Sequence, residues 1–174
     1  MIELYRPVPI DFEKHDRDYF ESTDNSLNTW LRRYSKQNRK KDFAATWVVA
    51  DANYRIVGYV TLTMSSLDLS SAPNAIAKGG PRLVPVLLCG RLAVDHRYAG
   101  AGIGSTLVGH VLTSAIELNQ KAACKAVVVN ALNPSARAWW TRIGFAPFTD
   151  EANDLDLYLL TKDAAATLAA LHRG

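Results

Sequence analysis

The 174-residue sequence has little cysteine, no long hydrophobic run and no strong excess of either charge. Its two cysteines, Cys89 and Cys124, are too few for a disulfide framework or a cysteine-rich zinc site. No apolar run approaches the ~20 residues that a transmembrane helix needs. The N-terminal segment carries Glu3 and lacks the apolar core of a signal peptide. These absences predict a soluble protein of a reducing compartment, and we expect a cytoplasmic location.

The residues that are present give an ordinary globular composition. Apolar residues make up 48% of the chain and charged residues 21%. The 20 Lys and Arg residues exceed the 17 Asp and Glu residues by a net charge of only +3. This small excess excludes a histone-like charge field but allows a local basic patch. With no internal repeat, the length predicts a single domain over residues 1–174.

The hydrophobic periodicity predicts a mixed chain of the α/β (α+β) class. A short polar turn at 51–55 joins two expected strands and indicates an antiparallel hairpin. The Ser-, Ala-, Gly- and Pro-rich segment 65–85 shows no period, and we expect a long loop there. The expected strands are 2–9, 46–50, 56–64, 86–94, 126–130, one that begins at Phe145, and 155–160. The expected helices are 24–38, 103–119, 134–143 and 163–172.

The helix expected over 24–38, with Asp24 as N-cap, has one apolar and one basic face. Leu27, Trp30, Leu31 and Tyr34 follow the spacing i, i+3, i+4, i+7 and are expected to face the core. The opposite face is either an ordinary solvated surface, which is the commoner role, or a surface for nucleic-acid phosphates. Its cations are Arg32, Arg33, Lys36, Arg39, Lys40 and Lys41, and Lys78 and Arg82 in the expected loop would extend it.

Three glycines, Gly100, Gly102 and Gly104, lie between an expected strand and an expected helix. Glycine allows close approach of a ligand, and the start of a helix presents unpaired N–H groups, so such a turn can bind phosphate. No lysine follows the last glycine, as a Walker A loop requires, and Ser105 stands where a dinucleotide fingerprint needs glycine. By itself the pattern fits a tight turn as well as a phosphate-binding loop.

Two motifs at the appropriate spacing resemble those of the GNAT N-acetyltransferase superfamily. The segment 97–102 (RYAGAG) is similar to its acyl-CoA motif R/Q-x-x-G-x-G/A, and the segment 133–145 (NPSARAWWTRIGF) is similar to N-x-x-A-x-x-F-Y-x-x-x-G-F. The resemblance implies the GNAT fold, a mixed central sheet flanked by helices whose fourth and fifth strands splay apart around pantetheine. It also implies acetyl-CoA as co-substrate and no metal.

The same resemblance assigns roles to individual residues. The backbone N–H of Leu92 would donate to the thioester oxygen. Trp140 stands at the position of the general-acid tyrosine, yet an indole N–H cannot deliver its proton at neutral pH. Trp140 therefore either packs against the thioester or marks a weakened enzyme. The residues that would bind acetyl-CoA are Leu92, Ala93, Val94, Arg97, Tyr98, Ala99, Gly100, Ala101, Gly102, Ile103, Gly104 and Asn133, of which Asn133 is also a simple helix cap.

A general base is missing from the expected strand 86–94, which holds no Asp or Glu. An α-amine has a pKa of about 7.7–8.0, and an adjacent ester lowers this pKa further, whereas a lysine side chain has a pKa of about 10.4. The missing base therefore favours an α-amine as acceptor. Cys89 and Tyr98 are chemically possible participants, although a core cysteine and a loop aromatic are their commoner roles.

The first half of the chain resembles a narrower GNAT subgroup. The segment 24–31 (DNSLNTWL), followed by Tyr34, Lys36 and Gln37, is similar to the opening helix of this subgroup. The loop that leads into 85–88 (PVLL), and the segment 91–95 (RLAVD) after it, also resemble the subgroup. This subgroup contains toxins that acetylate the α-amine of aminoacyl-tRNA and block translation. The resemblance implies aminoacyl-tRNA bound by the basic residues listed above, a ribbon-helix-helix antitoxin, a homodimer as one state of assembly, and no membrane partner.

Two other functions stay open at this point. The first is a GNAT enzyme that acetylates a small amine or a protein N-terminus, for which the basic helix would be only a solvated face. The second is an acyl-CoA-binding or antitoxin-binding module with weakened catalysis, which Trp140 would explain.

Overall fold

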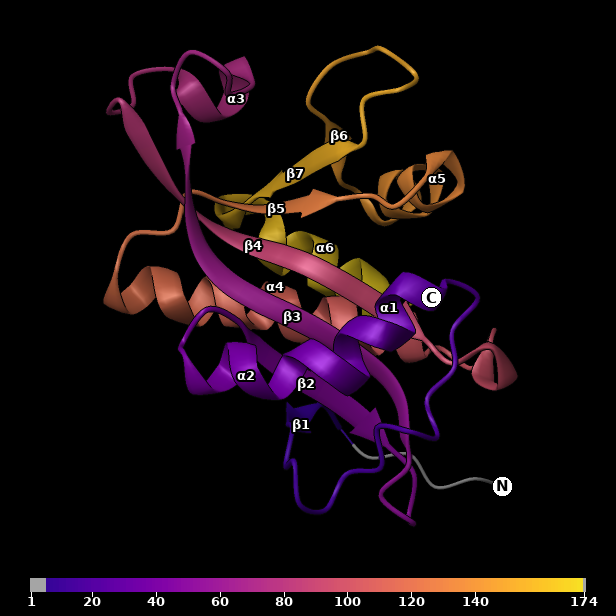
Figure 1. Cartoon of the computed structure of the whole chain (residues 1–174). Helices are drawn as coiled ribbons and strands as arrows, with labels where there is room; N and C mark the ends of the chain where they lie inside the picture. Colours follow the sequence, from indigo (N-terminus) through magenta and orange to yellow (C-terminus); the bar gives the residue numbers. More distant parts are fainter. Residues whose placement is uncertain (1–5, 174) are drawn as a thin grey trace. The chain divides into compact units, whose positions relative to one another are not determined.

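The computed structural model describes residues 6–173 and contains a mixed sheet with the strand order β1-β2-β3-β4-β5-β7-β6 (Figure 1). The mixed α/β class predicted from the sequence is confirmed. The strands are β1 (Val8–Pro9), β2 (Ala45–Ala50), β3 (Ile56–Asp68), β4 (Leu83–Val94), β5 (Ala126–Asn130), β6 (Ala146–Pro147) and β7 (Asp156–Leu160). The helices are α1 (Asn25–Thr29), the π-helix η1 (Trp30–Tyr34), α2 (Ser35–Lys40), α3 (Asn74–Ala77), the 3-10 helix η2 (His96–Tyr98), α4 (Ile103–Lys121), α5 (Pro134–Ile143) and α6 (Thr161–Arg173).

The chain divides into two compact units. The first unit comprises the residues up to Thr63 together with Gly90–His110, and the second comprises Met64–Cys89 together with the residues from Val111 onward. β3, β4 and α4 contribute residues to both units. Within residues 6–173, no helix combines the length and the apolar character needed to cross a membrane.

The first unit contains the predicted hairpin. β2 and β3 pair antiparallel, and β1 pairs with the other edge of β2. Of the strand expected over 2–9, Val8–Pro9 forms, and residues 2–5 lie outside the described part of the chain. The carboxylate of Asp51 accepts hydrogen bonds from the backbone amides of Asn53 (2.9 Å) and Arg55 (3.0 Å), which fixes the turn. The core of this unit consists of Phe20, Trp30, Leu31, Ala44, Val48, Ile56, Tyr59 and Ala93.

The helix expected over 24–38 forms, but it contains a π turn. Asp24 caps it as predicted, and α2 packs against β2 (Figure 1). In η1 the backbone amide of Ser35 donates to the carbonyl of Trp30, so one extra residue enters this turn and the following residues change face. Ser35 is fully buried and Tyr34 is 49% exposed. The expectation that Tyr34 faces the core is therefore wrong.

The segment 65–85 in the second unit is not the long loop that its composition predicts. β3 continues to Asp68, α3 follows, and β4 already begins at Leu83. Leu67 and Leu69 pack against a buried cluster that includes Ile76. These two leucines alternate with exposed polar residues, which is the period of a half-buried strand. The Ser-rich composition concealed this alternation.

The rest of the second unit follows the predicted order. β4 and β5 pair in parallel from Val86–Ala126 to Cys89–Val129, and β7 pairs antiparallel with both β5 and β6. The β4–β5 ladder ends at Cys89, although β4 itself runs on to Val94, and the splay of the two strands stays a prediction. The predicted strand at Phe145 begins one residue later, and α6 begins at Thr161 rather than Asp163.

Candidate active site

The glycine turn of the first unit has an open backbone. Gly100 (φ +78°) and Gly102 (φ +84°) occupy the left-handed region, and a Cβ built at either position meets no atom within 4 Å. α4 begins directly after the turn at Ile103, and Gly102 has no side chain with which to cap it. The first amides of a helix have no intrahelical acceptor. The turn can therefore present these amides to a phosphate, as the sequence predicts.

A buried carboxylate fixes the entrance to this turn. Asp95 is fully buried and accepts hydrogen bonds from the backbone N–H and the Nε of Arg97 (both 2.9 Å) and from its Nη2 (2.7 Å). It also accepts the backbone amide of Glu21 at 2.9 Å. The guanidinium of Arg97 lies 3.9 Å from the ring centroid of Tyr19 and donates to the Tyr19 carbonyl. The Arg97 side chain is thus engaged by protein groups.

We call Asp95 and its donors Arg97 and Glu21 the carboxylate clamp. The sequence did not reveal this clamp, because Arg97 was expected among the acetyl-CoA-binding residues without a role for its side chain. The signal that could have found it is the opposite charge two residues apart at the end of a buried strand, Asp95 and Arg97. Burial raises the pKa of the Asp95 carboxyl, but the hydrogen bonds from Arg97 and Glu21 outweigh burial and hold this pKa below its usual value. The same pairing raises the pKa of Arg97.

The end of β4 presents its side chains alternately to two faces. Ala93 is buried in the core of the first unit, whereas Leu92 and Val94 are half-buried. The guanidinium of Arg91 lies 4.3 Å from the ring centroid of Trp30, so the helix formed by α1 and η1 covers the face that carries Arg91 and Ala93. Leu92, the predicted oxyanion donor, alternates with these residues and belongs to the other face.

Asn133 and Trp140 lie on the helix α5 of the second unit. The side chain of Asn133 accepts the backbone amide of Ala136 at 2.8 Å, so its capping role is confirmed, and its contact with pantetheine stays a prediction. Trp140 is buried and meets the rings of Trp139 (centroids 5.1 Å apart) and Phe145 (4.8 Å) edge to face. Its indole is therefore a packing group of this unit.

The two other candidate participants are not ionised at neutral pH. Burial raises the pKa of the Cys89 thiol to about 12, so no thiolate is present to attack a thioester. The hydroxyl of Tyr98 lies 3.4 Å from that of Tyr19, and this contact is the main cause that raises the pKa of Tyr98 to about 12. Among residues 6–173, no group of three or more His, Cys, Asp and Glu side chains could hold a metal ion.

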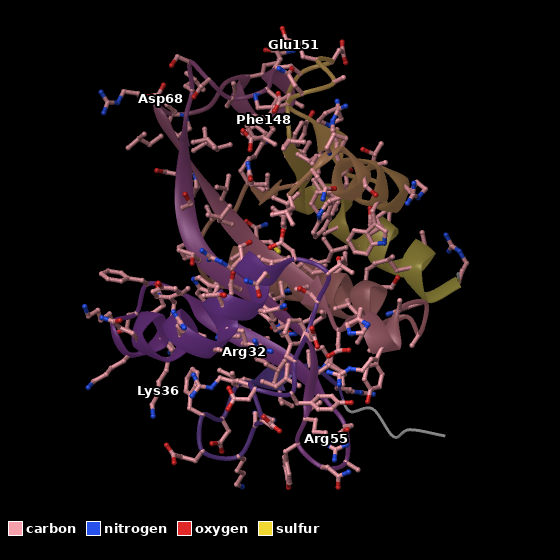
Figure 2. The ribbon with its side chains drawn as sticks, turned by 45° about the vertical axis from the view of Figure 1, so that its right-hand side comes forward. Arg32, Lys36, Arg55, Asp68, Phe148 and Glu151 are labelled. Carbon is pink, nitrogen blue, oxygen red and sulfur yellow. The ribbon has the colours of Figure 1, made fainter. Side chains whose placement is uncertain are left out.

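The basic face of the helix is exposed except at Arg32 (Figure 2). Nη2 of Arg32 donates to the carbonyls of Asp18 (3.2 Å) and Phe20, so this side chain ties the preceding loop to the helix. The Nη2 of Arg32 is thus engaged by the protein, and the contact of this residue with tRNA phosphates stays a prediction. The other cations predicted for this helix face are all exposed, namely Arg33, Lys36, Arg39, Lys40 and Lys41. Lys78 and Arg82 are exposed in the second unit.

Comparison with known proteins identifies the family. The profile described as "Acetyltransferase (GNAT) family" matches residues 10–145. The chain belongs to the GNAT family. A curated relative, the tRNA-acetylating toxin of Mycobacterium tuberculosis, is 31% identical over 149 residues, which cover 86% of this chain and 88% of the relative. The acyltransferase class predicted from the sequence is confirmed by this membership.

Two solved structures share the fold of this GNAT enzyme. AtaT complexed with acetyl-methionyl-tRNAfMet has a TM-score of 0.84 at 24% identity, covering 94% of this chain and 98% of that chain. A tyrosine-to-phenylalanine mutant of AtaT bound to acetyl-CoA and to the C-terminus of the antitoxin AtaR has a TM-score of 0.79 at 22% identity, covering 94% and 97%. The GNAT fold predicted from the two motifs is thereby confirmed.

The glycine turn gives the first testable prediction. Gly102→Glu places a carboxylate and a side chain in the open space where the pyrophosphate of acetyl-CoA is expected, and we expect calorimetry to show at least a tenfold loss of acetyl-CoA affinity. The matched control is Gly79→Glu, at a residue of the second unit with φ +72° and equally open surroundings. It carries the same backbone strain and the same charge. Equal affinities of the two variants would contradict the assignment of the turn.

The carboxylate clamp gives the second prediction. Because the pKa of Asp95 is lowered in the folded state, its stabilising effect is present above the unfolded pKa of ~3.9 and is lost as the pH falls through the folded pKa. We expect Asp95→Asn to lower the free energy of unfolding by about 2 kcal/mol at pH 7, since Arg97 is partly exposed and solvent screens the pair. Urea denaturation at pH 7 and pH 3 measures the difference.

The control for this prediction is Glu151→Gln, which removes an exposed carboxylate and should change stability by less than about 0.5 kcal/mol. The deficit of Asp95→Asn relative to the parent should shrink at pH 3. A deficit that stays constant from pH 7 to pH 3 would show that the charge of Asp95 contributes nothing.

Proposed function

We propose that this enzyme transfers the acetyl group of acetyl-CoA to the α-amine of an aminoacyl-tRNA and thereby blocks translation. The observation that carries the proposal is the 31% identity to a tRNA-acetylating toxin across 86% of the chain. The first unit supports it, because this unit holds both an open glycine turn and an exposed basic helix face. The acetyl-CoA and tRNA bound to AtaT, which shares the fold, agree with the two proposed substrates.

The chemistry requires little of the protein. The neutral α-amine attacks the thioester carbonyl, the carbon–sulfur bond breaks, and the amine loses one proton to solvent water as the amide forms. The backbone N–H of Leu92 donates to the carbonyl oxygen while negative charge develops there. Coenzyme A leaves as a thiolate, which a thiol with a pKa near ~8.5 tolerates without an acid. The ester-activated α-amine likewise needs no strong base.

The basic helix face supplies the electrostatic attraction for tRNA. Lys36 is 3.7 Å from Glu13 and Arg39 is 3.3 Å from Asp42, and both pairs are exposed. Exposed pairs contribute about 0–1 kcal/mol, so phosphates can replace these acids at small cost. Binding through such contacts is sensitive to salt and tolerant of sequence.

The partners and the assembly are part of the same proposal. We propose that a ribbon-helix-helix antitoxin binds the enzyme, as the toxin subgroup implies and as the complex of AtaT with AtaR supports. We also propose a homodimer and, because charged tRNA is cytoplasmic, a cytoplasmic location. The two units are proposed to form one acetyltransferase domain, because the family match at 10–145 includes residues of both.

The decisive experiment measures acetyl transfer from labelled acetyl-CoA to a mixture of charged tRNAs. We expect label on the aminoacyl group, released by mild base together with the amino acid, and none on uncharged tRNA. Transfer to small amines or to peptide N-termini instead would support the other enzymatic function. Acetyl-CoA binding without transfer to any amine would support the binding module, which the packing of Trp140 favours.

The basic face gives a third prediction. Replacing Arg33 and Lys40 by Glu should weaken tRNA binding and lower the magnitude of its salt slope by about 2, because roughly one counterion is released per phosphate contact. Acetyl-CoA affinity should not change. The matched control replaces Lys121 and Lys162, which are exposed in the second unit, by Glu. If the salt slope is the same in both double variants, the helix face is an ordinary solvated surface and does not bind tRNA.

Trp140 gives the fourth prediction. Trp140→Tyr introduces a proton donor at the position of the family's tyrosine, whereas Trp140→Phe leaves a ring without one. Both lose part of the edge-to-face contacts with Trp139 and Phe145, so a packing loss of about 1–2 kcal/mol should be common to the two. We expect the Tyr variant to match or exceed the parent in single-turnover transfer and to exceed the Phe variant. Equal rates for Tyr and Phe would show that no donor is needed here.

A further inference from the structure

Two large aromatic side chains are exposed on the basic part of the first unit. Tyr34 is 49% exposed and Phe43 is 64% exposed. Tyr34 owes this exposure to the π turn, because regular helical spacing would place it on the buried face with Trp30 and Leu31. π turns inside helices are frequent at functional sites. The helix therefore carries a local irregularity whose visible effect is to turn one ring toward solvent.

Hydrogen bonds hold the backbone of Phe43 at the C-terminal end of the same helix. The side-chain amide of Asn38 donates to the carbonyl of Tyr34 at 2.9 Å, and the backbone amide of Phe43 donates to the carbonyl of Asn38 at 2.9 Å. The hydroxyl of Thr63 donates to the carbonyl of Phe43, also at 2.9 Å. The backbone of Phe43 is thus tied to Asn38, one turn after Tyr34 on the helix. We call the two rings, with Arg33, Lys36, Arg39, Lys40 and Lys41, the aromatic–basic surface.

The helix that carries most of this surface contacts the strand that carries the proposed oxyanion donor. Trp30 contacts the guanidinium of Arg91, and Arg91 directly precedes Leu92 on β4. Tyr34 follows Trp30 by four residues on the same helix, which is about 6 Å along the axis. A few nucleotides can span that distance. Tyr34 therefore belongs to the helix that contacts β4 at the residue next to Leu92.

We propose that Tyr34 and Phe43 stack on unpaired nucleobases at the 3′ end of the aminoacyl-tRNA, while the neighbouring cations bind the phosphates. This inference rests on the proposed function. The 3′ end carries the amino acid and is single-stranded, so its base faces are available, whereas the faces of paired bases are already stacked on one another. Base–aromatic stacking tolerates any base sequence because every base has a π-face. Charge complementarity selects a polyanion for this surface.

The test separates the ring from its hydroxyl and from its apolar bulk. Tyr34→Leu and Phe43→Leu remove the rings, and each should raise the KM for charged tRNA about tenfold. Tyr34→Phe keeps the ring and should behave as the parent. The control for position is Tyr54→Leu, which removes a ring that is 53% exposed on the turn between β2 and β3, and it should change nothing.

Three further measurements distinguish stacking from other roles. Since the rings carry no charge, the salt slope of tRNA binding should stay as in the parent, and the kcat at saturating tRNA and the affinity for acetyl-CoA should also be unchanged. The melting temperature of each variant should equal that of the parent, because both side chains are exposed. 2-Aminopurine placed at the 3′-terminal position of the tRNA should be quenched by the parent and less quenched by both Leu variants.

The outcomes identify which inference fails. An unchanged KM and unchanged quenching in both Leu variants, with a parent that transfers acetyl to charged tRNA, would overturn the stacking proposal alone. A parent that binds no tRNA would overturn this proposal together with the proposed function. Loss of antitoxin binding in the Leu variants with intact tRNA binding would assign the surface to a protein partner and overturn the stacking proposal as well.

Discussion

The buried carboxylate of Asp95 is the interaction on which the first unit depends. It stands where β4 ends and the glycine turn begins, and it accepts hydrogen bonds from Arg97 and from the amide of Glu21. A carboxylate can be fully buried only where such donors replace its water shell. Through Glu21 the same group fixes the loop that precedes the basic helix. One charge therefore positions both the predicted phosphate-binding turn and the chain that leads into the candidate tRNA surface.

The basic helix is tied to this network at a second point. Arg32 donates to the carbonyls of Asp18 and Phe20, and Nη1 of Arg17 donates in turn to the carbonyl of Arg32 at 3.1 Å. A cation that the sequence groups with five others thus serves the loop, while its neighbours remain exposed. The π turn then sets which side chains of the following residues face solvent. The π turn thus places the ring of Tyr34 on the exposed side of the helix together with the neighbouring cations. The composition of the segment alone does not predict this arrangement.

The proposed acetyl transfer has little need for a strong acid or a strong base, and the candidate residues of the expected site supply neither. Cys89 and Tyr98 are held in their neutral forms, and Trp140 is packed between two other rings. An amine that is in large part neutral near pH 7 and a thiol with a pKa near ~8.5 reduce the need for a strong base and a strong acid, although a donor at position 140 would still raise the rate. The demands on the protein are then to bind acetyl-CoA, to place the amine and to offer an N–H to the carbonyl oxygen, and backbone groups can meet the last of these.

The sequence by itself determined the class of fold, the glycine turn, the caps at Asp24 and Asn133, and membership of the GNAT family, because each depends on a local pattern or on a spaced motif. It could not place Tyr34, because the extra residue of the π turn moves the following side chains to another face of the helix. It misjudged 65–85, because Leu67 and Leu69 pack against a buried cluster whose members, such as Ile76 and Ala126, come from other elements. It also could not separate Arg32 from the other cations of the helix. Only the tertiary structure brings the carbonyls of Asp18 and Phe20 to its guanidinium, since hydrogen-bond partners remote in the sequence are set by the folded chain.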